Sequence, residues 1–178
     1  TYKDNPVDLN STESYWIYQK TEDNLTMDTP AGKTGDMSGT EITLKTGWNF
    51  IGSPYPFQVP LQLDQVQFYG PLTYGISGES WSPVVTELDP WNGYVVYNRM
   101  STDQIITLDP SIGSGTTVAR KVEENGWLMS LDLSSGTHGD HINTLGALET
   151  AEDALEWHDN PEIRSPGTGV SLFFKLEE

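Results

Sequence analysis

The 178-residue sequence contains no cysteine and only 9 Lys and Arg side chains against 26 Asp and Glu. Without cysteine there are no disulfides, thiol chemistry or thiolate metal sites. The net charge of −17 opposes contact with phosphate backbones and anionic membranes, so nucleic acid is not expected as a partner. No apolar run approaches the ~20 residues that cross a bilayer, so membrane insertion is not expected. No basic, apolar leader begins at Thr1, and any signal peptide would lie upstream.

Turn-forming and aromatic residues are abundant instead. The chain holds 17 Gly, 11 Pro and 19 aromatic side chains (6 Trp, 8 Tyr and 5 Phe), and this content is sufficient to build a core. Short runs with a period of two, such as residues 41–45 and 127–133, predict strands. We therefore expect an all-β fold, an antiparallel β-sandwich of the jelly-roll kind. One short helix is predicted near residues 150–158, where Thr150 and Asp153 resemble a capping box.

An internal repeat organises the sequence. Gly47-Trp48 and Gly126-Trp127 lie 79 positions apart (127 minus 48), and the flanking segments keep the same order with offsets of 79 and 76. The repeat predicts two related sandwich units, in tandem or sharing one core. Trp48 and Trp127 are expected to be buried at equivalent places in the two units. The predicted units are residues 34–113 and 114–178, preceded by residues 1–33 as the tail of a preceding unit or the first strands of unit one.

No catalytic residue is assigned. The sequence lacks a Gly-x-Ser-x-Gly nucleophile motif and a phosphate-binding glycine loop, so we do not expect an enzyme. A small glycosidase would need two carboxylates ~5 to 9.5 Å apart. Glu79 and Glu87, on either side of Trp81, are the first pair to test, and solvated strand ends are the simpler interpretation.

No cofactor is expected, and calcium is the single candidate. The three histidines, His138, His141 and His158, lie in an acidic stretch but have no recognisable zinc-ligand spacing. Calcium prefers hard oxygen ligands, and an extracellular setting supplies millimolar concentrations of it. An acidic surface that serves only solubility is the preferred interpretation. The predicted calcium ligands are Asp140, Asn143, Asp153 and Asp159.

Three aromatic residues are candidates for contact with a glycan or a partner protein. Tyr55, Trp81 and Trp91 lie in predicted loops or short strands, where an exposed ring can stack on a sugar or on a partner surface. Packing inside the protein is the favoured interpretation for each of them.

Two of these segments resemble a known family. Residues 47–57, GWNFIGSPYPF, and residues 88–97, LDPWNGYVVY, are similar to segments that recur in large secreted bacterial proteins with a type IX secretion C-terminal sorting domain. Residues 127–131, 143–146 and 171–174 resemble the β region that often precedes that domain. The resemblance covers most of residues 40–178. The sorting domain itself is absent from this sequence.

The resemblance implies a non-catalytic structural or adhesion module of a larger protein, located outside the cell or at the surface of a bacterium. Its implied partners are other domains of the same polypeptide, a glycan or another surface protein. A carbohydrate-binding module attached to a secreted hydrolase is the alternative. A small jelly-roll glycosidase ranks third.

Overall fold

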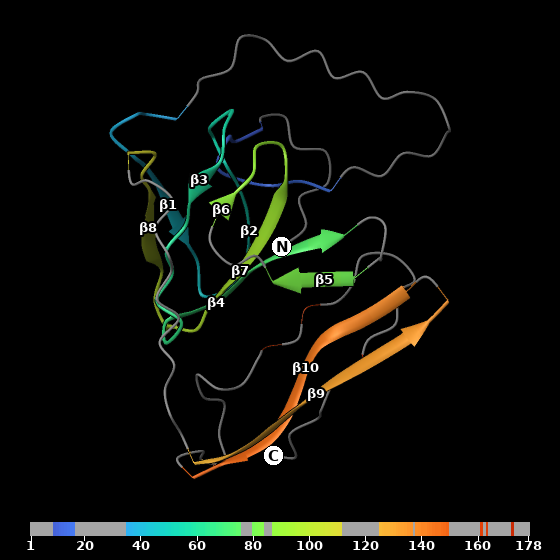
Figure 1. Cartoon of the computed structure of the whole chain (residues 1–178). Helices are drawn as coiled ribbons and strands as arrows, with labels where there is room; N and C mark the ends of the chain where they lie inside the picture. Colours follow the sequence, from blue (N-terminus) through green and yellow to red (C-terminus); the bar gives the residue numbers. More distant parts are fainter. Residues whose placement is uncertain are drawn as a thin grey trace.

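In the computed structural model, every element of regular secondary structure among the described residues is a β-strand (Figure 1). This confirms the prediction of an all-β, antiparallel fold with packed sheets. The helix predicted near residues 150–158 lies outside this part. Among the described residues there is no helix of the length and apolarity needed to cross a membrane. The structure describes residues 9–16, 35–75, 80–83, 87–111, 125–136 and 138–149, with single positions at 161, 163 and 172.

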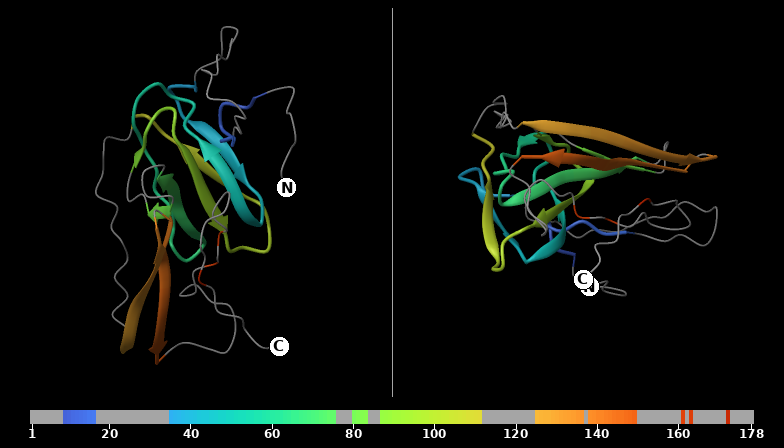
Figure 2. Two further views of the ribbon diagram at one scale, coloured as in Figure 1. Left: turned by 90° about the vertical axis from the view of Figure 1, so that its right-hand side faces the viewer. Right: turned by 90° about the horizontal axis from the view of Figure 1, so that it is seen from below.

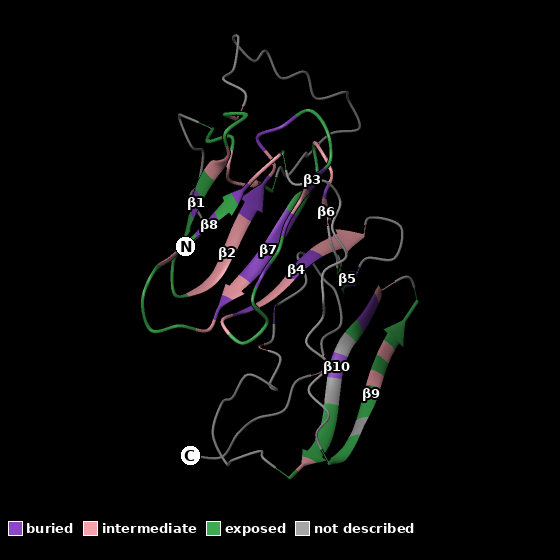
Figure 3. Cartoon of the chain, turned by 60° about the vertical axis from the view of Figure 1, so that its left-hand side comes forward, coloured by how far each residue is buried: buried purple, intermediate pink, exposed green. Residues whose placement is uncertain are grey.

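A four-stranded antiparallel sheet forms the centre of the fold. Its order is β2-β7-β4-β5, with β2 Gly47–Gly52, β7 Gly93–Asn98, β4 Phe68–Gly75 and β5 Ser80–Pro83. In β7, the consecutive side chains Tyr94, Val95 and Val96 are all buried, as the purple colour of this strand shows in Figure 3. Consecutive buried residues mean that both faces of the strand are covered.

One face of this sheet carries the larger core. Strands β1 (Thr40–Leu44) and β8 (Gln104–Leu108) pair with each other, and β3 (Val59–Pro60) pairs with β6 (Glu87–Leu88). The alternation predicted for residues 41–45 is confirmed, because Ile42 and Leu44 are buried while Glu41 and Thr43 are exposed. The core residues are Ile42, Leu44, Ile51, Tyr55, Val59, Leu61, Leu63, Phe68, Leu88, Tyr94, Val96, Ile106 and Leu108.

The opposite face of the sheet carries a smaller, aromatic core. Four side chains are buried there, and Trp48, Phe50, Tyr69 and Tyr74 pack against them. The rings meet edge to face, with centroids 5.1 Å apart for Trp48 and Tyr97 and 5.2 Å apart for Tyr74 and Trp81. Such pairs add ~0.5–1.5 kcal/mol beyond the area that they bury. The four buried residues are Leu72, Trp81, Val95 and Ile163.

A long hairpin extends from the central sheet (Figures 1 and 2). Its strands are β9 (Gly126–Ser135) and β10 (His138–Leu148), and β10 passes within 8 Å of β5 between Cα atoms. The pairing register shifts between Asp140 and Asn143, which marks a β-bulge or similar irregularity.

The expected burial of Trp127 is wrong. Its side chain is 55% exposed on the hairpin, whereas Trp48 is half-buried. Trp127 lies opposite Ala147, while Trp48 lies opposite Tyr97 in a sheet with a core on each face. The two Gly-Trp pairs therefore occupy different environments, and their strands pair differently in the described part of the chain.

Candidate functional site

The turn between β6 and β7 exposes an aromatic ring. Trp91 is 94% exposed, which makes it the most exposed large apolar side chain among the described residues. Its backbone φ is +67°, in the left-handed region. For an ordinary L-residue this conformation costs ~1–2 kcal/mol. A bulky residue with positive φ is an outlier, and such strain concentrates at functional positions.

The sequence predicted the turn here but not the strained residue within it. Pro90 supplies the fixed φ that suits the first central position of a turn, and the next position takes positive φ in a type II turn. Gly or Asn is favoured at that next position, yet Trp91 occupies it, ahead of Asn92 and Gly93. An Asn-Gly pair is a turn signal by residue type, but it does not show which residue adopts the left-handed conformation.

Hydrogen bonds hold this turn against the core. The backbone N–H of Asp89 donates to Oη of buried Tyr94 over 2.7 Å. Burial raises the pKa of Tyr94, and hydrogen bonds from the Asp89 backbone and the Asn92 side chain act in the opposite direction. Nε2 of Gln58 donates to Oδ1 of Asp89. The turn is thus tied both to β7 and to the chain that enters β3, which positions Trp91 firmly at the surface.

A hydrogen bond links the turn that carries Trp91 to a segment with a second exposed aromatic side chain. The Gln58–Asp89 hydrogen bond joins its turn to the segment that contains Phe57, whose side chain is 41% exposed. Two exposed rings and the polar side chains of Gln58 and Asp89 therefore belong to two linked segments. Aromatic faces with neighbouring hydrogen-bonding groups suit either a sugar ring or a protein surface.

The other two predicted contact residues are inside the protein. Tyr55 is buried, and its Oη lies 2.6 Å from the carbonyl oxygen of Asp36 and 2.9 Å from Oγ1 of Thr40. Trp81 is buried against Tyr74. Neither ring presents a face to solvent. The packing interpretation therefore fits both residues, and only Trp91 of the three is placed for surface contact.

Of the two carboxylates proposed for a glycosidase, Glu87 lies among the described residues and Glu79 does not. Glu87 lies half-buried in β6 opposite Pro60. Glu79 lies outside the described residues, so its separation from Glu87 stays untested.

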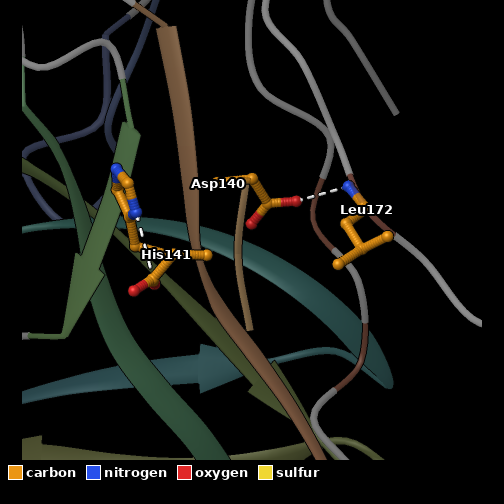
Figure 4. A network of polar contacts seen from close by, with 4 residues as sticks. Asp140, His141 and Leu172 are labelled. Carbon is orange, nitrogen blue, oxygen red and sulfur yellow. Dashed lines mark hydrogen bonds and ion pairs between the residues drawn. The ribbon is translucent and has the colours of Figure 1, made fainter. Parts of the chain in front are cut away.

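Two predicted calcium ligands lie on β10, around the bulge. Asp140 is buried, and its Oδ2 accepts a hydrogen bond of 2.7 Å from the backbone N–H of Leu172 (Figure 4). Asn143 is also buried, and its Nδ2 has no hydrogen-bond partner among the described residues. Asp153 and Asp159 lie outside the described residues.

No group of three His, Asp or Glu side chains with metal-site geometry occurs in the described ranges. Calcium binding therefore stays a prediction about the complete acidic stretch.

Sequence reasoning missed one contact on this hairpin. Nδ1 of His141 lies 3.3 Å from Oδ1 of Asp132, and both side chains are exposed. The two residues belong to neighbouring strands of an antiparallel pair, so only the pairing register and its shift could have revealed the contact. An exposed His–Asp contact of this kind contributes little to stability.

No protein-family model, curated protein or solved structure matches this chain. The exposed Trp91 turn and the resemblance of the sequence motifs are therefore the two features that bear on function.

Proposed function

We propose that this chain is a non-catalytic structural and adhesion module of a larger secreted or cell-surface bacterial protein, and that the Trp91 turn contacts its partner. The observation that carries this proposal is an almost fully exposed Trp in a strained turn, which hydrogen bonds tie to a buried Tyr and to a neighbouring segment. Exposed Trp side chains on well-fixed segments are frequent energetic centres of protein contacts. The extracellular location follows from the motif resemblance.

A carbohydrate-binding module is the second candidate. The same turn favours it, because Trp91 offers a ring for stacking and Asp89 and Gln58 offer groups that hydrogen-bond hydroxyls. In either role the chain itself has no hydrolytic activity. A panel of polysaccharide, peptide and ester substrates checks this, and turnover that Glu87→Gln abolishes would favour the glycosidase interpretation instead.

A binding assay with cell envelopes and immobilised polysaccharides distinguishes a protein partner from a carbohydrate ligand. The labelled chain is applied to bacterial cell envelopes, to protease-treated envelopes and to immobilised polysaccharides. Binding that protease abolishes indicates a protein partner. Binding that survives protease and is displaced by a soluble polysaccharide indicates a carbohydrate ligand.

The variants Trp91→Ala and Ile105→Ala identify the surface used. Ile105 is 64% exposed on β8, so its truncation removes a comparable exposed apolar side chain at another place. We expect Trp91→Ala to weaken binding about 30-fold, as for loss of a ~2 kcal/mol contact, while Ile105→Ala changes little. Equal binding by the two variants would exclude the Trp91 turn as the contact site.

A further inference from the structure

The hairpin carries an apolar patch where its strands extend away from the central sheet (Figure 3). Antiparallel pairing places Trp127 opposite Ala147 and Met129 opposite Leu145. Side chains that lie directly opposite each other share one face of the pair, as do positions two apart along a strand. These four side chains therefore form one surface, which we call the outer hairpin face.

The outer hairpin face is open to solvent. Trp127, Met129 and Leu145 are 55%, 45% and 39% exposed, and Ala147 is exposed as well. Single exposed apolar side chains are common on protein surfaces, but adjacent ones mark interaction sites. A two-stranded hairpin is at best marginally stable in water, so cover on this face would also stabilise the hairpin.

The same face becomes covered toward the β9–β10 turn. Leu131 and Leu133 are half-buried there, and the residues opposite them, Asn143 and Asp140, are buried. Two polar side chains are thus covered, whereas three large apolar ones are exposed farther out. This order is the reverse of what solvation favours. The exposed end is therefore the part of the hairpin that is suited to a partner.

The charge around this face has a single sign. Residues 125–149 contain no Lys or Arg. Glu149 lies two positions beyond Ala147 and therefore on the same face, where its Oε2 accepts a hydrogen bond of 2.7 Å from Nδ2 of exposed Asn125. The outer hairpin face is thus apolar and bordered by a carboxylate, in a chain whose net charge is −17.

We infer that the outer hairpin face binds a basic, amphipathic segment of another protein. The apolar side chains of that segment cover Trp127 and Met129, and its Lys or Arg side chains meet the carboxylate of Glu149. Charge complementarity favours this occupant over a second copy of the chain, because two copies would bring two net charges of −17 together. This surface belongs to strands other than those that flank the Trp91 turn, so it is a second contact site.

Synthetic peptides test the chemistry of the partner. The probe is a peptide of Leu and Lys with the pattern of an amphipathic helix. In one control peptide Glu replaces Lys, and in another Gln replaces Leu. We expect the Leu-Lys peptide to bind about tenfold more tightly than either control, as measured by fluorescence anisotropy of labelled peptides. Equal binding of the Gln-Lys peptide would reduce the contact to general charge attraction, and equal binding of the Leu-Glu peptide would exclude a basic partner; either result overturns the inference.

Variants of the chain locate the binding. Trp127→Ala and Met129→Ala should each weaken binding of the Leu-Lys peptide about tenfold, because each removes an exposed apolar side chain from the face. Ile105→Ala and Trp91→Ala remove exposed apolar side chains elsewhere and should leave this binding unchanged. Equal losses in Trp91→Ala and Trp127→Ala would show adsorption without a defined site and would overturn the inference. Since Trp91→Ala is also the test of the proposed partner contact, the two surfaces can fail separately.

Because the sequence contains no cysteine, single introduced thiols can show whether the face is open. Met129→Cys places a thiol on the face, and Ser101→Cys places one in the exposed loop after β7. Iodoacetamide alkylates each thiolate with loss of iodide, at a rate that depends on exposure. We expect similar rates for the two variants. Saturating Leu-Lys peptide should slow alkylation about tenfold in Met129→Cys and leave Ser101→Cys unchanged.

Two results of the thiol experiment would overturn the inference. Alkylation of Met129→Cys about a hundredfold slower than that of Ser101→Cys, in the absence of peptide, would mean that the same chain or a second copy already covers the face. Sedimentation velocity distinguishes these two occupants, because only a second copy gives a dimer. Equal alkylation of Met129→Cys with and without bound peptide would place the peptide elsewhere on the molecule.

Discussion

At the scale of single residues, Trp91 combines an exposed ring with an unfavourable backbone conformation. Trp91→Gly removes the steric cost of positive φ but increases the entropy of the unfolded chain. We expect the free energy of unfolding to rise by about 0.5–1 kcal/mol while partner binding weakens as it does in Trp91→Ala. Urea unfolding measures the first effect. A clear destabilisation would mean that the Trp91 side chain packs on the protein and is not held ready for a partner.

Tyr94 connects the same turn to the core. Tyr94→Phe removes the acceptor of the Asp89 N–H and should cost about 1–3 kcal/mol. Because burial raises the pKa of Tyr94 above its ordinary value of 10.0, the native state holds this proton more tightly than the unfolded state. Its contribution is fully present below pH 10 and is lost as the pH rises through the raised pKa.

Thermal unfolding between pH 8 and 11.5 checks this pH dependence. The midpoint of the Tyr94→Phe variant should fall less steeply above pH 10 than that of the unsubstituted chain. The pKa of Tyr15 is also raised, first by burial, so part of the alkaline slope should persist. Identical slopes in the two proteins would show that the Tyr94 hydroxyl does not titrate with folding.

Residue type alone could not separate Trp91 from Tyr55 and Trp81. All three are aromatic residues in short strands or turns, and both packing and surface contact were open for each. Burial depends on which layers cover the residue: Trp81 faces the core that includes Ile163, which is distant in the sequence. The positive φ of Trp91 has no sequence signal, since Asn92 and Gly93 were the better candidates for it.

At the scale of elements, strand positions were predictable where a period of two was clear. Residues 41–45 alternate as expected in β1. The same pattern in residues 127–133 predicted β9 but not the exposure of Trp127. Periodicity tells which side chains share a face and not whether another layer covers that face.

The bulge of β10 provides a stability test of the hairpin. Asp140→Ala removes a buried acceptor and leaves the Leu172 N–H unpaired, which should cost about 1–3 kcal/mol. Asp140→Asn keeps an acceptor oxygen of similar shape and should cost less. Denaturant unfolding compares the two variants. Equal losses would mean that the negative charge, rather than the hydrogen bond to Leu172, determines the contribution of Asp140.

At the scale of the whole molecule, the excess of acidic residues is the basis of the predicted calcium binding. If the stretch that contains Asp140, Asn143, Asp153 and Asp159 binds calcium, occupancy at 100 times the dissociation constant adds ~2.7 kcal/mol to the free energy of unfolding. Thermal unfolding in millimolar calcium, against magnesium at matched ionic strength, should then show a higher midpoint with calcium. An unchanged midpoint would leave these acids as solubilising surface.

The layered arrangement constrains two of the segments on which the proposed resemblance to secreted bacterial proteins rests. Residues 47–52 form β2 and residues 93–98 form β7, and side chains of both strands face the two cores. Their sequence is therefore constrained by packing on both faces of the central sheet. The turn between β6 and β7, where Trp91 is exposed, is free to carry a specific contact.

Binding of the Trp91→Ala and Ile105→Ala variants to bacterial envelopes tests the central claim most directly. A surface module that uses the β6–β7 turn predicts saturable binding, about 30-fold weaker for Trp91→Ala and nearly unchanged for Ile105→Ala. Both variants should show the same far-ultraviolet circular dichroism as the unsubstituted chain. Undiminished binding by folded Trp91→Ala would contradict the account.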